Sequence, residues 1–243
     1  MTAVRELIGD RAVAKQCGGY LDTLGADGVP RSTAQAVMDS TFLPEIYERL
    51  WRPILFGAAT AGISEADEAD MMRLLLKLRA GDRVLDVGCG PGNTLRRLLE
   101  TVGPDGLAVG VDAARGMLER AVEDTPAANA VFVRADGGLL PFADESFDAV
   151  SCFGTLYLVD RPFDVIDELV RVLAPGGRVA ILTSCHRAPA PLRPLVDLGR
   201  PVTGFRWFGP DQIVRALRNA GLTTVHREVR GLMQFVGAVK STR

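Results

Sequence analysis

The segment at residues 83–94 constrains the fold more than any other part of the chain. An apolar run at residues 84–87 is followed by three glycines at alternate positions, Gly88, Gly90 and Gly92, and then by a helical pattern of leucines. This order predicts a buried strand, a tight turn and the start of a helix. Glycines allow positive φ angles in such a turn and let a ligand lie against the backbone. The helix start adds free N–H groups that face polar ligand atoms.

Two details separate this turn from other glycine-rich loops. A dinucleotide-binding fingerprint requires a third glycine at position 93, which is Asn93 here, and a phosphate-binding P-loop requires a Gly-Lys-Ser/Thr sequence that does not follow. Asp86 stands two residues before the first glycine, at the ligand-facing end of the predicted strand. A buried carboxylate is costly there unless it meets a donor, such as the ammonium group of an amino-acid-like ligand.

The sequence VLDVGCGPGN at residues 84–93 resembles motif I of class I S-adenosylmethionine (SAM) dependent methyltransferases. Its form is similar to that of the small-molecule branch that includes the ubiquinone/menaquinone C-methyltransferases. Two further segments resemble the same family, namely the Leu-Pro-Phe and Asp-x-Ser-Phe-Asp-x-Val run within residues 139–150 and Leu-Ala-Pro-Gly-Gly at residues 173–177. The resemblance covers about residues 65–240 and implies SAM as the cofactor, with S-adenosylhomocysteine as its product.

The resemblance and the order of the patterns imply an α/β fold. We expect a Rossmann-like, doubly wound, seven-stranded and mostly parallel sheet with a C-terminal antiparallel hairpin, plus an N-terminal helical lid. Residues 63–243 would form the SAM-binding domain, residues 1–62 the helical cap or lid, and residues 185–209 an insertion on the acceptor side. Strands are expected at residues 84–87, 107–111, 130–134, 147–153, 178–183, 222–229 and 232–239, and the first helix of the domain at 64–79.

Aspartates follow three of the predicted strands. With the glycine loop, Asp86 would hold the methionine end of SAM, and Asp112 would accept hydrogen bonds from the ribose hydroxyls. The family resemblance assigns the adenine amino group to Asp136. Helix capping is an alternative role for Asp112, and turn formation is one for Asp136. The predicted cofactor-binding residues are Asp86, Gly88, Cys89, Gly90, Gly92, Asn93, Asp112, Ala113, Met117, Asp136, Gly137 and Phe153.

Candidate catalytic residues lie after the fourth and fifth predicted strands. Many relatives carry a histidine pair within the loop that occupies residues 154–160 here, but this chain has none, so Tyr157 is the candidate for orienting an acceptor. His186 follows the fifth strand on the ligand side, and histidine is the natural proton acceptor at neutral pH. Core packing for Tyr157 and a surface loop for His186 are the alternatives. The candidate substrate and lid residues are Tyr47, Trp51, Phe205 and Trp207.

Composition limits the partners and the compartment. A net charge of −2 provides no basic footprint for nucleic acid. No apolar run reaches the length of a membrane span, and no signal peptide is evident. The four cysteines form no C-x-x-C pair, which favours a reducing, cytoplasmic compartment and argues against a metal site.

The chemistry implied by SAM is an in-line displacement in which the protein positions the acceptor and excludes water. The apolar flanks favour a small apolar acceptor, such as a quinone, an isoprenoid, a polyketide or a lipid precursor. Two other classes remain open from the sequence. One is a dinucleotide-dependent oxidoreductase, and the other is a protein that uses SAM structurally or in a reaction without methyl transfer. The sequence predicts neither the methylated atom nor the oligomeric state.

Overall fold

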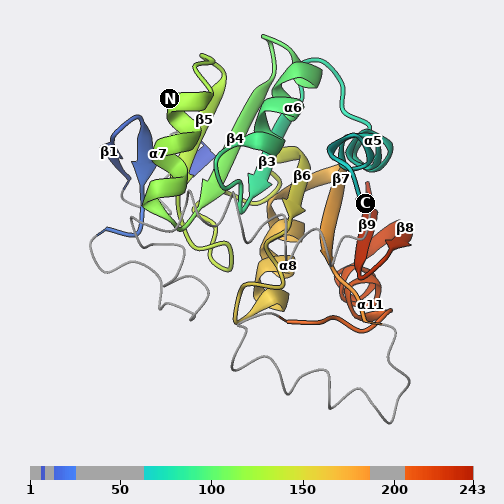
Figure 1. Ribbon diagram of the computed structural model, residues 1–243. Helices are drawn as coiled ribbons and strands as arrows, with labels where there is room; N and C mark the ends of the chain where they lie inside the picture. Colours follow the sequence, from blue (N-terminus) through green and yellow to red (C-terminus); the bar gives the residue numbers. More distant parts are fainter. Residues whose placement is uncertain (1–6, 9–13, 26–62, 187–205, 243) are drawn as a thin grey trace.

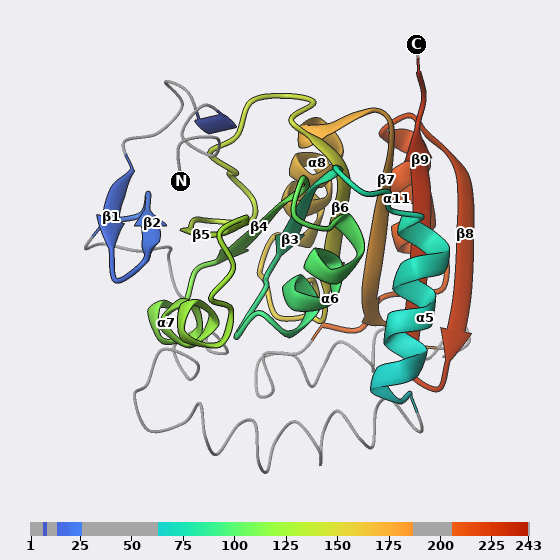
Figure 2. The same cartoon turned by 90° about the horizontal axis from the view of Figure 1, so that it is seen from above.

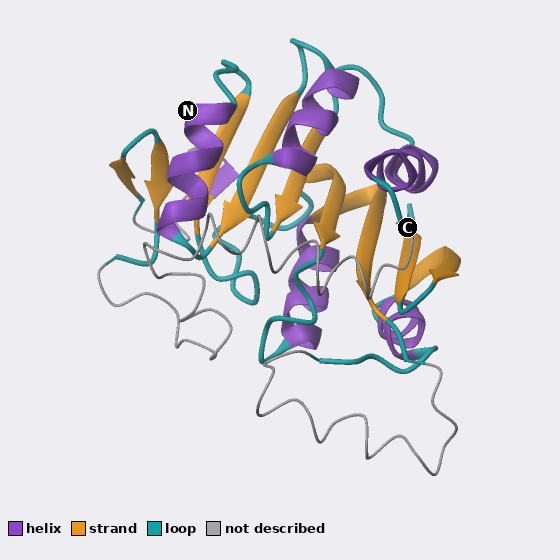
Figure 3. Cartoon of the chain, viewed as in Figure 1, coloured by secondary structure: helices purple, strands orange, loops and turns teal. Residues whose placement is uncertain are grey.

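A nine-stranded sheet runs through the part of the chain that the computed structural model describes, namely residues 7–8, 14–25, 63–186 and 206–242 (Figures 1 and 3). The strand order is β1-β2-β5-β4-β3-β6-β7-β9-β8. The strands are β1 Lys15–Cys17, β2 Tyr20–Asp22, β3 Arg83–Val87, β4 Leu107–Asp112, β5 Ala130–Arg134, β6 Phe147–Phe153, β7 Leu173–Ser184, β8 Leu222–Arg230 and β9 Met233–Lys240. The helices are α5 Glu65–Leu76, α6 Asn93–Val102, α7 Arg115–Asp124, α8 Pro162–Val172 and α11 Gln212–Asn219.

Strand β3 lies near the centre of the sheet, where the chain order reverses. It pairs in parallel with β4 on one side and with β6 on the other, so that Asp86 stands opposite both Gly110 and Ser151. After β3 the chain winds outward through β4 and β5 and then returns to β6. In open α/β sheets, ligands bind beyond the carboxyl ends of the strands at such a reversal. The ends of β3, β4 and β6 are therefore the expected place for a ligand.

Helices cover both faces of the sheet. Figures 1 and 2 show α5, α6 and α7 on one face and α8 and α11 on the other. Helix α5 begins in a capping box between Ser64 and Asp67, and it ends at Leu76 because Lys77 adopts a left-handed φ of 46°. The helix is thus shorter than the predicted residues 64–79.

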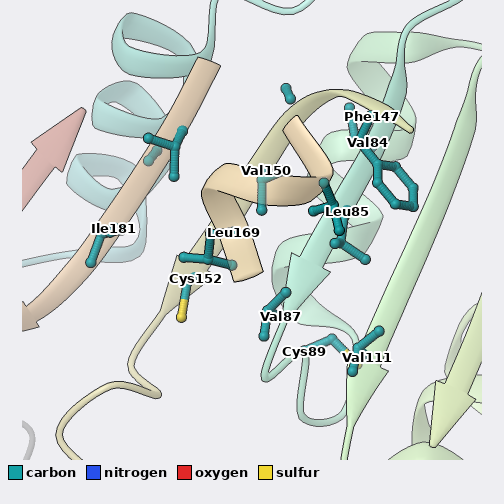
Figure 4. Close-up of a cluster of buried hydrophobic side chains, with 14 of the residues drawn as sticks. Val84, Leu85, Val87, Cys89, Val111, Phe147, Val150, Cys152, Leu169 and Ile181 are labelled. Atoms are coloured by element: carbon teal, nitrogen blue, oxygen red, sulfur yellow. The ribbon is translucent and has the colours of Figure 1, made fainter. Parts of the chain in front are cut away.

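Apolar side chains of the central strands form the core. Leu85, Val150 and Ile181 have no exposed surface, and Leu169 of α8 belongs to the same cluster (Figure 4). Strands that are covered on both faces have nearly continuous apolar sequences, so their positions could be predicted from the sequence. Polar side chains that lie inside this core need an explanation from function or from pairing.

The N-terminal part of the sheet corrects the predicted strand number. Residues 14–25 were predicted within a helical cap, but they form a hairpin whose strand β2 pairs in parallel with β5. Tyr20 and Leu21 are buried in this arrangement. A strand of three residues is too short to carry a periodic sequence signal, so the prediction of seven strands was two too few within the described residues. The α/β, Rossmann-like class and the terminal antiparallel pair β8–β9 are confirmed.

Strand β7 also differs from the prediction, because it begins at Leu173 rather than at residue 178. Leu173 pairs with Phe147, and the register then shifts before Ala149 pairs with Arg178. A break of this kind carries the strand through the Pro-Gly-Gly sequence at residues 175–177. Among the described helices, none combines the length and apolar character needed to cross a membrane.

Candidate cofactor site

The glycine loop between β3 and α6 folds tightly against neighbouring strand ends. Gly88, Gly90 and Gly92 all have left-handed φ angles, of 76°, 52° and 84°. The N–H of Gly88 donates to the Val111 carbonyl at 2.7 Å. A Cβ atom on Gly88 would lie 1.9 Å from Oγ1 of Thr155, so a side chain cannot be accommodated there. The loop therefore places backbone at the carboxyl edge of the sheet, where a ligand can approach it closely.

Asp112 connects this loop to the next helix. Its Oδ2 accepts the N–H of Gly90 at 2.9 Å, and its Oδ1 accepts the N–H of Ala114 at 2.9 Å. Ala114 is the N-cap residue of α7 and has no side-chain cap of its own, so Asp112 shapes the turn that leads into the helix. The Asp112 carboxylate therefore bridges the glycine loop and the turn before α7.

Asp86 is a buried carboxyl group within β3. It is 1% exposed, and its Oδ1 accepts the hydroxyl of Ser151 at 2.6 Å. Its Oδ2 is buried without a hydrogen-bond partner among the described residues. Burial raises the pKa of Asp86 to about 7, the hydrogen bond from Ser151 opposes that rise, and the negative charge of Asp112 adds to it. An unpaired carboxylate oxygen at this strand end fits the ammonium group at the methionine end of SAM.

Asp136 lies in a tight turn after β5. Its Oδ1 accepts the N–H of Gly138 at 2.8 Å, and a backbone bridge links it to Leu139. The turn packs close to the end of β3, since a Cβ on Gly137 would lie 3.2 Å from Cγ1 of Val87. The structure thus brings Asp136 to the same edge as the glycine loop, in the turn role that the sequence had left as an alternative.

The other predicted cofactor residues occupy different environments. The Asn93 side-chain oxygen accepts a short hydrogen bond from Arg96. Cys89 is buried beside Gly110, and burial holds the pKa of its thiol well above the usual range. Phe153 packs edge-on against the ring of Phe235, with 6.1 Å between the ring centroids. The carbonyl of Ala113 accepts from Arg134, and Met117 is half-buried on α7.

Residues 206–208 connect the two loops that carry the candidate catalytic residues. The N–H of Arg206 donates to the carbonyl of Tyr157 at 2.9 Å, and the N–H of His186 donates to the carbonyl of Phe208 at 2.9 Å. Tyr157 is 2% exposed, whereas His186 and Trp207 are half-buried. Trp207 therefore lies between Arg206, which bonds to the loop after β6, and Phe208, which bonds to the segment after β7. Tyr47, Trp51 and Phe205 lie outside the described residues.

Sequence reasoning missed two residues that touch this site, Ser151 and Thr155. Ser151 donates to Asp86, and Thr155 lies directly against Gly88. A serine inside the apolar β6 was an available signal, because a buried hydroxyl needs a partner. No comparable signal marked Thr155, since its contact depends on how two loops meet. Within the described ranges, no group of three or more histidine, cysteine, aspartate or glutamate residues is arranged to hold a metal ion.

A doubly wound sheet with a terminal antiparallel pair, and a glycine loop beside carboxylates at its reversal point, defines the class of cofactor-binding α/β proteins. A family model described as "Methyltransferase domain" matches residues 85–181. The chain is 34% identical over 195 residues to demethylmenaquinone methyltransferase of Roseiflexus sp. (strain RS-1), a match that covers 75% of this chain and 77% of that protein. The chain therefore belongs to the SAM-dependent methyltransferase family, and S-adenosylmethionine is its cofactor.

Two further comparisons concern a sequence relative and a protein of similar fold. The ubiquinone/menaquinone biosynthesis C-methyltransferase UbiE of Ectopseudomonas mendocina is 38% identical over 109 residues, and that match spans 43% of each chain. Phosphoethanolamine N-methyltransferase 2 of Haemonchus contortus, solved in complex with SAM, has a similar fold with a TM-score of 0.66 and 17% identity. That likeness covers 87% of this chain and 61% of the other. The prediction of the family and of its cofactor is confirmed.

Proposed function

We propose that this protein transfers the methyl group of SAM to a small, apolar acceptor at the carboxyl edge of the sheet. The observation that carries the proposal is the buried, unpaired Oδ2 of Asp86 beside the glycine loop. SAM, when bound, supplies an activated methyl group on a sulfonium whose leaving group is a neutral sulfide. The protein then needs to hold the two reactants at attack distance and to keep water out.

Each half of the cofactor has its own residues in this proposal. Asp86 pairs with the ammonium group, and the backbone from Gly88 to Gly92 lies along the methionine end. Asp112 accepts from the ribose hydroxyls, and Asp136 accepts from the adenine amino group. Ala113, Met117 and Phe153 are the flanking apolar residues.

The acceptor side is assigned to the segments beyond β6 and β7. Tyr157 orients the acceptor, and His186 is the candidate base where the acceptor must lose a proton. Trp207 lies between them along the chain segment that connects both loops. Tyr47, Trp51 and Phe205 complete the apolar lining in this proposal. Residues 1–62, apart from the hairpin at residues 14–25 that joins the sheet, would then act as the cap, and residues 185–209 as the acceptor-side insertion.

The names of the relatives support an apolar, quinone-like acceptor. Proteins with 34% and 40% identity are named demethylmenaquinone methyltransferases, and they come from two Roseiflexus strains. A cytoplasmic location is part of the proposal, because all four cysteines are unpaired thiols, as in a reducing compartment.

The proposal is tested with methyl-labelled SAM, the purified protein and cell extract, separated afterwards into organic, aqueous and protein fractions. We expect label in the organic fraction, and no label when Asp86 is replaced by alanine. Label that appears only in the aqueous or protein fraction would contradict the apolar acceptor. Tight SAM binding without label in any fraction would favour a role without methyl transfer. Residues 154–160 contain no histidine, which is consistent with such a role.

A further inference from the structure

The N-terminal hairpin ends in a buried charge cluster at the carboxyl edge of the sheet. Strand β2 pairs with β5 so that Leu21 stands opposite Val133 and Asp22 opposite Arg134. The last residue of β2 therefore meets the last residue of β5. The strand on the other side of β5 is β4, which ends at Asp112, so the cluster lies one strand away from the proposed ribose ligand.

Asp22 is the anion of this cluster and is 5% exposed. Its Oδ1 accepts the N–H groups of Leu24 and Gly25 at 3.0 Å each, and its Oδ2 lies 3.2 Å from both Arg115 and Arg134. A buried carboxylate with this many donors is held in one place, because any displacement leaves charge unpaired in a poorly solvated site.

Arg134 is the cation that reaches from this anion to the cofactor loops. It is 6% exposed, and its Nη1 donates to the Gly25 carbonyl at 2.8 Å as well as to Asp22. Its Nε donates to the carbonyl of Ala113 at 3.0 Å. Since the guanidinium group is a rigid plane, fixing it on one side fixes the carbonyl that it contacts on the other.

The Ala113 carbonyl belongs to the turn on which the proposed adenosine site depends. Asp112, the preceding residue, accepts from Gly90 of the glycine loop and from Ala114 of the same turn. The backbone carbonyl of Asp112 also accepts the N–H of Ala135 at 3.2 Å, next to Arg134. A contiguous set of contacts therefore runs from Asp22 through Arg134 and Ala113 to the carboxylate of Asp112.

We propose that Asp22 and Arg134 are positioning residues for the adenosine half of SAM. They hold the turn at residues 112–114 in the geometry that accepts the ribose and the adenine, without contacting the cofactor themselves. The inference rests on the proposed cofactor site and gives the N-terminal hairpin a part in cofactor affinity. Neither residue was singled out by its sequence context.

The test measures binding of S-adenosylhomocysteine by isothermal titration calorimetry, with a thermal melt of each protein. Asp22→Asn keeps the side-chain shape but removes the charge that orients Arg134. Arg134→Lys keeps the charge but cannot reach three acceptors at once. We expect both variants to bind S-adenosylhomocysteine roughly tenfold more weakly than the wild type, within the usual range for couplings through packed networks.

Asp148→Asn is the matched control, because it removes a carboxylate at the opposite edge of the sheet. Asp148 accepts the N–H of Arg83 at 2.8 Å, where β3 begins. We expect this variant to bind with wild-type affinity.

Wild-type affinity in both test variants, measured where they are folded, would overturn the inference even if their melting temperatures fall. If Asp22→Asn does not fold, Arg134→Lys decides the question by itself. Failure of the wild-type protein to bind S-adenosylhomocysteine would instead reject the proposed cofactor site, and the inference with it.

Discussion

Asp86 is the residue at which stability and binding make opposite demands. The folded protein pays for burying this carboxyl group, and burial raises its pKa to about 7 from an ordinary value of 3.8. The folded state therefore binds a proton more tightly than the unfolded state does between these two values. Stability is consequently lost as the pH rises through that window. The cofactor ammonium, in contrast, requires the ionised form.

We predict that Asp86→Asn stabilises the protein without cofactor at pH 8 and weakens its binding of S-adenosylhomocysteine. The asparagine avoids the cost of a buried charge, which is on the order of a few kcal/mol for a carboxyl group whose pKa rises from 3.8 to about 7. Urea denaturation at pH 8 measures the stability, and calorimetry measures the affinity. Lower stability of the variant at pH 8 would contradict the buried-charge account.

The pH dependence of binding supplies the control for this prediction. Wild-type affinity for S-adenosylhomocysteine should rise from pH 6 to pH 8 and approach a tenfold change per pH unit on the acid side. The Asp86→Asn variant should show a flat profile, because it has no carboxyl group to ionise there. Identical profiles for the two proteins would place the titrating group elsewhere.

At the scale of elements, the turn between β3 and α6 is held by the loop that follows β6. A Cβ on Gly88 would overlap Thr155, whereas a Cβ on Gly90 would meet no atom within 4 Å. Both glycines have left-handed φ angles, so both substitutions carry a similar backbone cost. The difference in stability between the two alanine variants therefore measures the contact between the glycine loop and the loop after β6.

We predict that Gly88→Ala lowers the free energy of unfolding by about 3 kcal/mol or more, because overpacking is added to the backbone cost. Gly90→Ala should lower it by about 1–2 kcal/mol, the backbone cost alone. Urea denaturation of the three proteins measures both values. Equal losses for the two variants would mean that the loop after β6 does not hold the turn in solution.

At the scale of the whole molecule, the N-terminal hairpin joins the sheet instead of standing apart from it. Leu21 has no exposed surface, and it lies on a strand that pairs with β5. The hairpin is therefore expected to unfold together with the central strands in one cooperative transition.

We predict that Leu21→Ala lowers the free energy of global unfolding by about 2–5 kcal/mol, as buried leucine truncations do. Leu139→Ala is the control, since Leu139 is 76% exposed and should change stability by less than about 0.5 kcal/mol. Circular dichroism during urea denaturation measures both variants. An unchanged midpoint for Leu21→Ala, or a separate early transition, would show that the hairpin is not part of the cooperative unit.

The sequence located the central strands, the glycine loop and the aspartates at the strand ends. The strands lie in long apolar runs, and the turn needs glycines at fixed positions, so the strands and the turn can both be recognised from short stretches of sequence. The sequence placed the end of α5 too late, because Lys77 adopts a left-handed φ that no glycine announces. It placed the start of β7 too late, because Leu173 pairs with the distant Phe147. It missed the hairpin at residues 14–25, whose strands are too short for a periodic pattern.

The sequence by itself indicated the family, the cofactor and the positions of the central strands along the chain, since motifs and apolar runs are local patterns. The tertiary structure alone decided which side chains meet. Ser151 reaches Asp86 across 65 positions, and Arg134 reaches Asp22 across 112. Such pairs leave no local pattern, because hydrogen bonds between distant positions offset the cost of burying charge and hydroxyl groups, and only the folded sheet brings those positions together.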